Sequence, residues 1–454
     1  MQKWTILAPL YLFVFATGAA GLIYQVAWQK YLSRLFGCDN IATAIILATF
    51  LGGLSFGYYL CGKLTTRVKN YFRAYAYLEG AIALWCLCFP TIFALVDHLT
   101  GSWSFAPPAL IIVQAFACSV LLMGVPTVCM GGTIPFLTRG ISKNVAEATG
   151  IHARVYGINT AGAFLGTLMA GFFLVPAFGL PLTVMGASVL NIGAFLFFYF
   201  LSGKQKGADR DEPAEPEPEK EEQGQTDEKA PAAPRTLPPL KFPGLVLYAI
   251  AFLSGFYVMT LENVLIRITN LSLGSSSYSF SMIVSVFVLS IAIGSYAVSR
   301  ARQLPRRSLF INQLAITLLL MLLYLSLDSW PYWAHVIRIT FQSNAVGFWA
   351  FYGGLFLVMT LVLVLPVSLM GATVPIAFHE LKEDLKNVGR DSGTLFSWNT
   401  TGNLTGSLLG GIVFFYLLDN PAVFSTAIFF AAVSTCLAAW PLRRKYMAAA
   451  AAAA

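Results

Sequence analysis

The sequence predicts an all-α integral membrane protein with about twelve transmembrane helices, arranged as two parallel repeats of six. The first observation is composition: the 454 residues are 57% hydrophobic and only 11% charged, with a mean hydropathy of +0.70. Such values lie outside the usual range for a soluble globular domain. The second is that apolar stretches near the membrane-crossing length recur along the chain, and the third is that blocks of the first half return in the second.

About twelve stretches are long and apolar enough to cross roughly 30 Å of hydrocarbon. Because lipid offers the backbone no hydrogen-bond partners, and the alternating pattern of a membrane barrel is absent, each is expected to be a helix. We expect the first stretch to stay in the membrane, since it has no signal-peptide cleavage site. The expected spans are residues 7–28, 40–62, 73–96, 109–138, 153–177, 181–202, 244–264, 278–299, 308–327, 346–378, 394–418 and 421–441.

The hexapeptides MGGTIP and MGATVP, at residues 130–135 and 370–375, indicate an internal duplication. The surrounding blocks align without gaps at an offset of 240 residues, and earlier blocks align at 237. Six spans is an even number, so both copies enter the membrane from the same side, which is the symmetry of major facilitator halves. Pairs at the offset of 240 include Pro135 with Pro375, Asn159 with Asn399, and Gly166 with Gly406.

The segment between the copies is acidic, rich in Pro and Ala, and without apolar periodicity. It cannot bury enough surface to offset its ordering entropy. The predicted divisions are an N-terminal half at 1–202, a disordered cytoplasmic linker at 203–242, a C-terminal half at 243–447 and a poly-Ala tail at 448–454.

Lys and Arg residues gather in the loops that share a side with the linker, which predicts that both termini are cytoplasmic. The formal charge of +8 is then a topology signal with some affinity for anionic lipid. We do not interpret it as nucleic-acid binding.

Glu262 is the acid that the sequence singles out, because a charge at membrane depth is costly and usually serves a function. It shares a helix face with Gly255, and Gln25 holds the matching place in the first half. The alternative is a structural pair of Glu262 with Arg267 or Lys30. Aromatic candidates for contact with a cation are Tyr24, Trp28 and Tyr257.

Small residues recur every fourth position after Asn159 and Asn399, and they include Gly166 and Gly406. This spacing gives each helix a smooth face that a neighbouring backbone can approach closely. We favour interhelical hydrogen bonds for the two asparagines, with lining of a transport pathway as the alternative.

Other polar or helix-weakening residues suggest structural or gating roles. Pro135 and Pro375 close the repeated hexapeptides and favour a kink or hinge over a binding loop. Glu79, with Gln313 at the matching place, is expected to steady the basic loop that contains Arg67.

The sequence has no signature of an enzyme, a cofactor site or a metal site. The seven cysteines form no metal-ligand spacing, the four histidines are scattered, and no GxSxG, HExxH or nucleotide-binding loop occurs. A membrane enzyme acting on lipid or quinone is disfavoured by the missing acid-base cluster.

The blocks GAAGLIYQVAWQKYLSRLFG, FLGGLSFGYYLCGKL, MGGTIPFLTR and YGINTAGAFLGTLMAGFFLVPAFGL resemble the membrane portion of a bacterial family, the fused major facilitator and spermidine synthase-like proteins. That family usually has an acid where this chain has Gln25 and an Arg where it has Lys30, and Glu262 and Arg267 occupy the equivalent places in the second half. The synthase-like domain has no counterpart in this sequence, and Thr66 stands where the facilitator loop has an acid.

The resemblance implies a transporter in the bacterial inner membrane that moves a small molecule, with a polyamine or related amine as the expected substrate. Its partners would be the lipid bilayer and that substrate. The alternative is a non-transporting anchor or partner for a separately encoded spermidine synthase-like soluble enzyme.

Deleting residues 206–238 should leave folding and any transport almost intact, because a disordered connection contributes reach and little packing. Thermal melting of the purified protein measures this. A melting temperature lowered by many degrees would mean that the segment packs against the bundle.

Overall fold

The computed structural model describes most of the chain, and all regular structure in the described part is helical. The predicted linker lies almost wholly outside the described residues, so its disorder and the boundaries of the halves stay predictions. The described residues are 2–453 without 37–38, 101–107, 206–241, 274–276, 302–303, 306, 342–343 and 383–384.

Each predicted span falls on helical segments of the structure, although some spans cover more than one segment. The first half, residues 2–205, contains α1 (Gln2–Phe36), α2 (Asp39–Leu64), α3 (Tyr71–Thr100), α4 (Pro108–Ile141), α5 (Val145–Met169), the π-helix η2 (Ala170–Leu174) and α6 (Val175–Gln205). The second half, residues 242–453, contains α7 (Gly244–Leu273), α8 (Ser277–Arg300), α9 (Ser308–Tyr324), η3 (Leu327–Ser329), α10 (Trp330–Ile339), α11 (Ala345–Leu381), η4 (Leu385–Asn387), α12 (Val388–Leu408), the π-helix η5 (Leu409–Val413), α13 (Phe414–Leu417) and α14 (Asn420–Ala453).

Among the described residues, nine helical segments are long and apolar enough to cross a membrane, and the bent pair of α9 with η3 and α10 makes a tenth. One of the nine, residues 147–203, contains two crossings. Gly179 interrupts it with a positive φ of 73°, a conformation that favours glycine. After this break α6 runs antiparallel to α1, since Tyr24 contacts Asn191 while Phe13 stacks on Phe197.

Helix α12, on which the predicted span 394–418 falls, is a further crossing, although it carries many polar residues and is not among the nine apolar segments. It follows α7 closely along its length: Gly402 lies against Phe252, and Gly406 lies against Phe256 one turn later. Its other side packs against α2. A helix covered by protein on both sides does not need the apolar surface that lipid requires.

The ninth predicted span, 308–327, differs in detail from the structure. Helix α9 ends at Tyr324, and the chain bends by 43° into η3 and α10. Pro331 lies in the first turn of α10, a position that suits the fixed φ of proline and its missing N–H. Helix α10 then packs against α7 and α11.

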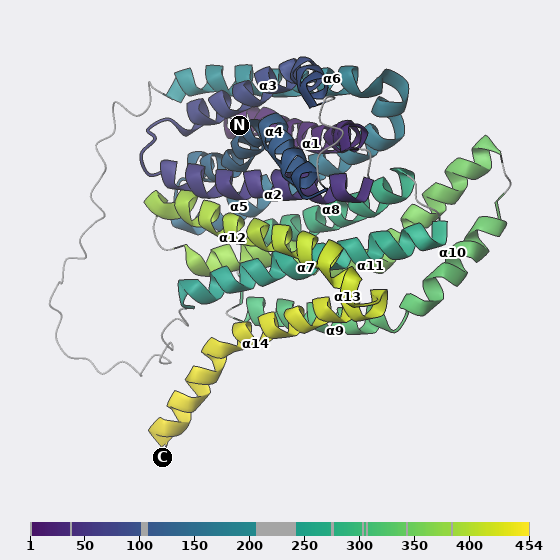
Figure 1. Cartoon of the computed structure of the whole chain (residues 1–454). Helices are drawn as coiled ribbons and strands as arrows, with labels where there is room; N and C mark the ends of the chain where they lie inside the picture. Colours follow the sequence, from purple (N-terminus) through teal and green to yellow (C-terminus); the bar gives the residue numbers. More distant parts are fainter. Residues whose placement is uncertain are drawn as a thin grey trace.

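The two halves form two layers, with the first half above the second in Figure 1. They meet where α2 packs against α12 and α5 packs against α8, which lie between the layers. Serines bridge both contacts: Ser55 Oγ donates to the Ser397 carbonyl oxygen at 2.9 Å, and Ser295 Oγ donates to the Ala153 carbonyl oxygen at 2.9 Å.

Glycines let helix backbones touch inside each half. A Cβ atom on Gly166 would overlap the Ala19 carbonyl oxygen, so α5 lies directly against α1. Gly406 has the same relation to Phe256, which places α12 against α7. These contacts agree with the smooth faces that the spacing of small residues predicts.

The repeated hexapeptides also supply close contacts. A Cβ on Gly131 would overlap the Leu54 carbonyl oxygen of α2, and one on Gly371 would meet the Ile291 backbone of α8. The following prolines, Pro135 and Pro375, lie inside the continuous helices α4 and α11. A hinge at these prolines stays a prediction.

Gly166→Leu and Gly406→Leu should each destabilise the protein by at least about 3 kcal/mol, because a branched side chain forces apart backbones that are in contact. Gly186→Leu is the matched control, since a Cβ at Gly186 of α6 meets nothing within 4 Å. Thermal melting in detergent gives the comparison. If all three variants melt with the parent, the glycine contacts do not hold the helices together.

Candidate functional site

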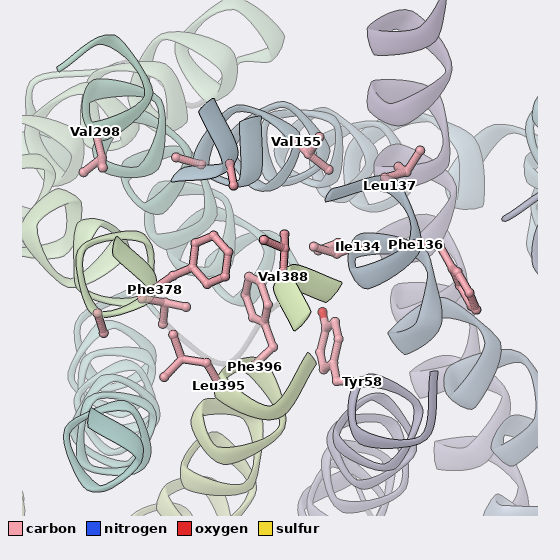
Figure 2. Close-up of a cluster of buried hydrophobic side chains, with 14 of the residues drawn as sticks. Tyr58, Ile134, Phe136, Leu137, Val155, Val298, Phe378, Val388, Leu395 and Phe396 are labelled. Carbon is pink, nitrogen blue, oxygen red and sulfur yellow. The ribbon is translucent and has the colours of Figure 1, made fainter. Parts of the chain in front are cut away.

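Apolar side chains of both halves form one buried cluster at the end of the bundle where α6 ends and α7 begins, which we call the linker end. In Figure 2 side chains from α2, α4 and α5 approach those from α8, α11 and α12. We name this group the linker-end cluster. Its members include Tyr58, Ile134, Leu137, Val155, Val298, Phe378, Val388, Leu395 and Phe396.

Two other buried clusters lie towards the opposite end, and each belongs to one half. The first-half cluster surrounds Trp28 and Phe89, and the second-half cluster surrounds Leu261 and Phe287. Among the described residues, the buried apolar cluster that joins both halves is therefore the one at the linker end. This arrangement suits two bodies that separate at one end while they hold together at the other.

Glu262 lies on α7, is partly exposed, and has no hydrogen-bond or ion-pair partner among the described residues. It follows Gly255 by seven residues, so both lie on nearly the same side of the helix. The neighbouring Leu261 and Leu265 are fully buried in the second-half cluster. Val258 and Leu265 lie four residues before and three residues after Glu262, so they share its face of α7, and both are buried in that cluster. Glu262 is therefore placed at the border of the second-half cluster.

The alternative partner Arg267 is occupied elsewhere. Its guanidinium group lies 3.9 Å from the centre of the Phe415 ring, which is a cation–π contact. Lys30, the other alternative partner, is exposed. The predicted structural pair of Glu262 with Arg267 is not formed.

Gln25 holds the matching place on α1. It follows Gly18 by seven residues and is partly exposed, as Glu262 is. Gly18 lies against the Asn159 backbone of α5, and Gly255 lies against the Asn399 backbone of α12. The two polar side chains are therefore placed by equivalent helix contacts.

The three aromatic candidates do not lie with these two residues. Tyr24, Trp28 and Tyr257 are fully buried inside the cores of their own halves. The Tyr24 hydroxyl donates to Asn191 Oδ1 at 2.7 Å, and its ring stacks on Trp28 with centroids 5.5 Å apart. Tyr257 donates to Gln313 Oε1 at 3.1 Å. This placement does not fit direct contact with a substrate in this conformation.

Glu79 has a structural position, but with a different partner from the expected one. Its Oε2 accepts a hydrogen bond from Asn191 Nδ2 at 2.6 Å, and Asn191 in turn accepts from Tyr24. The side chain is 1% exposed, whereas Arg67 is exposed in the loop after α2. The carboxylate therefore ties α3 to α6 and α1, and it does not steady the basic loop.

The second half contains a corresponding network around Gln313. Its Oε1 accepts from Tyr257 and from Ser434 at 2.8 Å, and its Nε2 donates to Thr373 Oγ1 at 2.9 Å. Helices α7, α9, α11 and α14 are thereby joined. Sequence reasoning missed Asn191, Ser434 and Thr373 as members, although polar residues inside apolar spans are a usable signal.

The two repeated asparagines make the interhelical hydrogen bonds that the sequence favours. Asn159 Nδ2 donates to the Val14 carbonyl oxygen at 3.3 Å, and Asn399 Nδ2 donates to the Ala251 carbonyl oxygen at 3.0 Å. Within the described part of the chain, no group of three or more His, Cys, Asp or Glu side chains is placed to hold a metal ion.

Comparison with curated proteins finds partial relatives. A polyamine aminopropyltransferase of Mycobacterium tuberculosis is 26% identical over 207 residues, which cover 42% of this chain and 36% of that protein. Polyamine aminopropyltransferase 1 of Streptomyces coelicolor is 25% identical over 201 residues, covering 44% and 35%. The matches thus span little more than a third of the length of these relatives. No family model matches the chain.

Solved structures match over nearly the whole chain. A bacterial homologue of the iron transporter ferroportin, in an outward-facing state, superposes with a TM-score of 0.58 at 12% identity, covering 96% of this chain and 99% of that one. The proton:xylose symporter XylE, a major facilitator superfamily protein, gives 0.54 at 10% identity, covering 95% and 94%. The fold is therefore like that of major facilitator superfamily proteins. At this level of identity the likeness shows the facilitator fold alone.

Glu79→Gln should be tolerated, whereas Glu79→Leu should destabilise the protein by about 1–3 kcal/mol, because leucine leaves the buried Asn191 amide without its acceptor. The second half supplies the precedent, since Gln313 fills the matching place. Thermal melting of both variants tests this. Equal losses for Gln and Leu would show that the charge of Glu79, rather than its hydrogen bond, stabilises the fold.

Proposed function

We propose that this chain is a multi-pass membrane transporter that moves a small organic cation, a polyamine or related amine, by alternating access between its two halves. The observation that carries the proposal is Glu262, a partly exposed acid on α7 of a facilitator-like fold. It has no hydrogen-bond or ion-pair partner among the residues that the structure describes. A carboxylate at membrane depth needs a cation or a proton beside it, and an ammonium substrate supplies one.

The arrangement of the halves supports alternating access. They share a buried apolar cluster at the linker end, while their other clusters are separate. Opening at the linker end would require parting residues such as Tyr58 from Phe396, whose rings stack with centroids 5.1 Å apart. Each half is held together by its own polar network and glycine contacts, so each can move as a unit.

The substrate class rests on charge and on the relatives. Glu262 would bind an ammonium group, and Gln25 at the matching place would accept a hydrogen bond from a second one. A substrate with two or more amines suits such a pair better than a monoamine. The partial relatives carry polyamine in their names.

We place the protein in the bacterial inner membrane with its linker end in the cytoplasm. Basic residues close to the membrane favour the cytoplasmic side. The helix ends and loops at the linker end carry Lys63, Arg67, Arg73, Arg139 and Arg300. On this placement the linker at 203–242 joins two domains, 1–202 and 243–447, within the cytoplasm.

A second candidate function is that of a membrane anchor or partner for a soluble spermidine synthase-like enzyme. The observation that favours it is that the partial relatives are aminopropyltransferases. An anchor needs no substrate path, so it predicts neither flux nor amine binding by the purified protein.

Glu262→Gln should abolish substrate-dependent flux of labelled putrescine or spermidine in proteoliposomes, because it keeps the side-chain shape and removes the charge that binds the amine. The melting temperature should change little, since Glu262 makes no hydrogen bond or ion pair with the described residues that the variant would lose.

Glu147→Gln is the matched control, because Glu147 is an exposed acid in the first turn of α5. It should transport as the parent does. If the parent protein neither binds nor moves putrescine or spermidine, the transport proposal is wrong. The anchor function would then be the remaining candidate. Full flux in Glu262→Gln would exclude this acid from the path.

A further inference from the structure

A histidine of one half is inserted into the other half at the linker end. His152 belongs to α5 and is fully buried. Its ring stacks on Phe378 of α11 with centroids 4.2 Å apart, and lies 5.1 Å from the ring of Phe396 of α12. The two phenylalanines belong to the linker-end cluster (Figure 2). The imidazole is therefore part of the contact that closes this end.

The two ring nitrogens of His152 are in different environments. Nδ1 lies 3.1 Å from Ser392 Oγ of α12 and 3.4 Å from Thr138 Oγ1 of α4. Nε2 is buried and has no hydrogen-bond partner among the described residues. A neutral ring can use Nδ1 with either hydroxyl, but a protonated ring carries an N–H at both nitrogens. The closed cluster offers no acceptor to the second N–H.

Other polar contacts cross between the halves beside this ring. The Lys382 ammonium donates to the Val145 carbonyl oxygen at 2.6 Å, and His379 Nδ1 lies 3.1 Å from Thr149 Oγ1. Lys382 is close enough to repel a positive charge on His152. The helices packed around the ring carry other titratable or charged groups. They include Tyr58 and Lys63 of α2, Arg139 of α4 over Tyr71, Glu147 and Tyr156 of α5, Arg154 of α5 over Tyr11 of α1, Arg300 of α8 over Tyr296, Glu380 of α11, and Asp391 and Arg390 of α12, 3.6 Å apart.

We propose that His152 is a proton-binding site whose occupation is coupled to separation of the halves at the linker end. In the closed state the ring stays neutral between Phe378 and Phe396. When the halves part, the ring meets water from that side and can take up a proton. The proton then opposes closure. As a step in the transport cycle, this role rests on the transport function proposed above.

The cost of burying the charge sets the direction of the coupling. Burying an imidazolium with an N–H that has no acceptor is strongly unfavourable. Stacking on two phenylalanine rings offsets only a small part of that cost. The open state therefore binds the additional proton, and by linkage a lower pH on the linker side favours the open state.

The test measures the distance between the halves at the linker end as a function of pH. Spin labels at Lys69→Cys and Ala301→Cys, with the native cysteines replaced, report it by pulsed electron resonance in nanodiscs. Lys69 follows α2 and Ala301 follows α8, and both side chains are exposed. We expect the population with the longer distance to rise roughly threefold or more from about pH 8 to about pH 5.5.

His152→Gln should remove this rise, because glutamine can hydrogen-bond Ser392 but does not titrate in this range. His379→Gln, which changes the other histidine at this contact, should leave a clear rise. His335→Gln is the matched control, since His335 is exposed on α10.

Three results would each overturn the proposal: a parent protein whose distances do not change with pH, a rise that persists in His152→Gln, or a rise that disappears in His379→Gln instead. The first result is measured on the parent protein, so it does not depend on whether His152→Gln folds. The measurement uses no substrate. Absence of amine flux would therefore contradict only the transport proposal. The measured distances would still show whether His152 binds the proton.

Discussion

The fold depends on direct contact between helix backbones at glycine positions. In lipid, association of helices gains little from the hydrophobic effect, so packing distance decides how strongly they hold. Gly166 and Gly406 bring α5 onto α1 and α12 onto α7 within the halves. Gly62 of α2 and Gly393 of α12 do the same between the halves. The asparagine and serine hydrogen bonds to backbone carbonyls are possible because the helices are already this close.

The duplicated halves share this packing and differ in where they place charge. In the first half, Glu79 lies buried between α3, α1 and α6. The neutral Gln313 lies at the matching place in the second half. The reverse holds in the first helix of each half, where the neutral Gln25 of α1 matches Glu262 of α7. At these two pairs of matching places, each repeat thus has one acid. The acid of the first half is held by hydrogen bonds, and the acid of the second has no hydrogen-bond or ion-pair partner in the described part of the chain.

Much of the fold could be predicted from the sequence, because period, length and repetition are local properties of a chain. The spans, the small-residue faces at Gly166 and Gly406, and the asparagine hydrogen bonds all follow from spacing. The site could be predicted less well. Tyr24 and Gln25 are adjacent, so they lie about 100° apart on α1. In a membrane protein both the lipid face and the core are apolar, and hydropathy does not show which direction is inward.

Long-range partners were beyond sequence reasoning for a similar reason. Asn191 is 112 residues from Glu79, and its role depends on α6 returning beside α3 after the break at Gly179. His152 acquires its environment from Phe378 and Phe396, which belong to the other half. Such contacts are set by how the halves dock, which no local pattern records.

The polarity of α12 has a consequence for biogenesis. A helix enters the bilayer alone when its apolar side chains outweigh its polar ones, and α12 combines Arg390, Asp391 and many hydroxyl and amide groups. Its glycine face becomes favourable in the membrane once α7 is there to cover it. During synthesis, α7 through α11 leave the ribosome first, so the partner is already waiting when α12 emerges. The order of helices along the chain thus allows an earlier helix, α7, to assist the membrane insertion of a later one, α12.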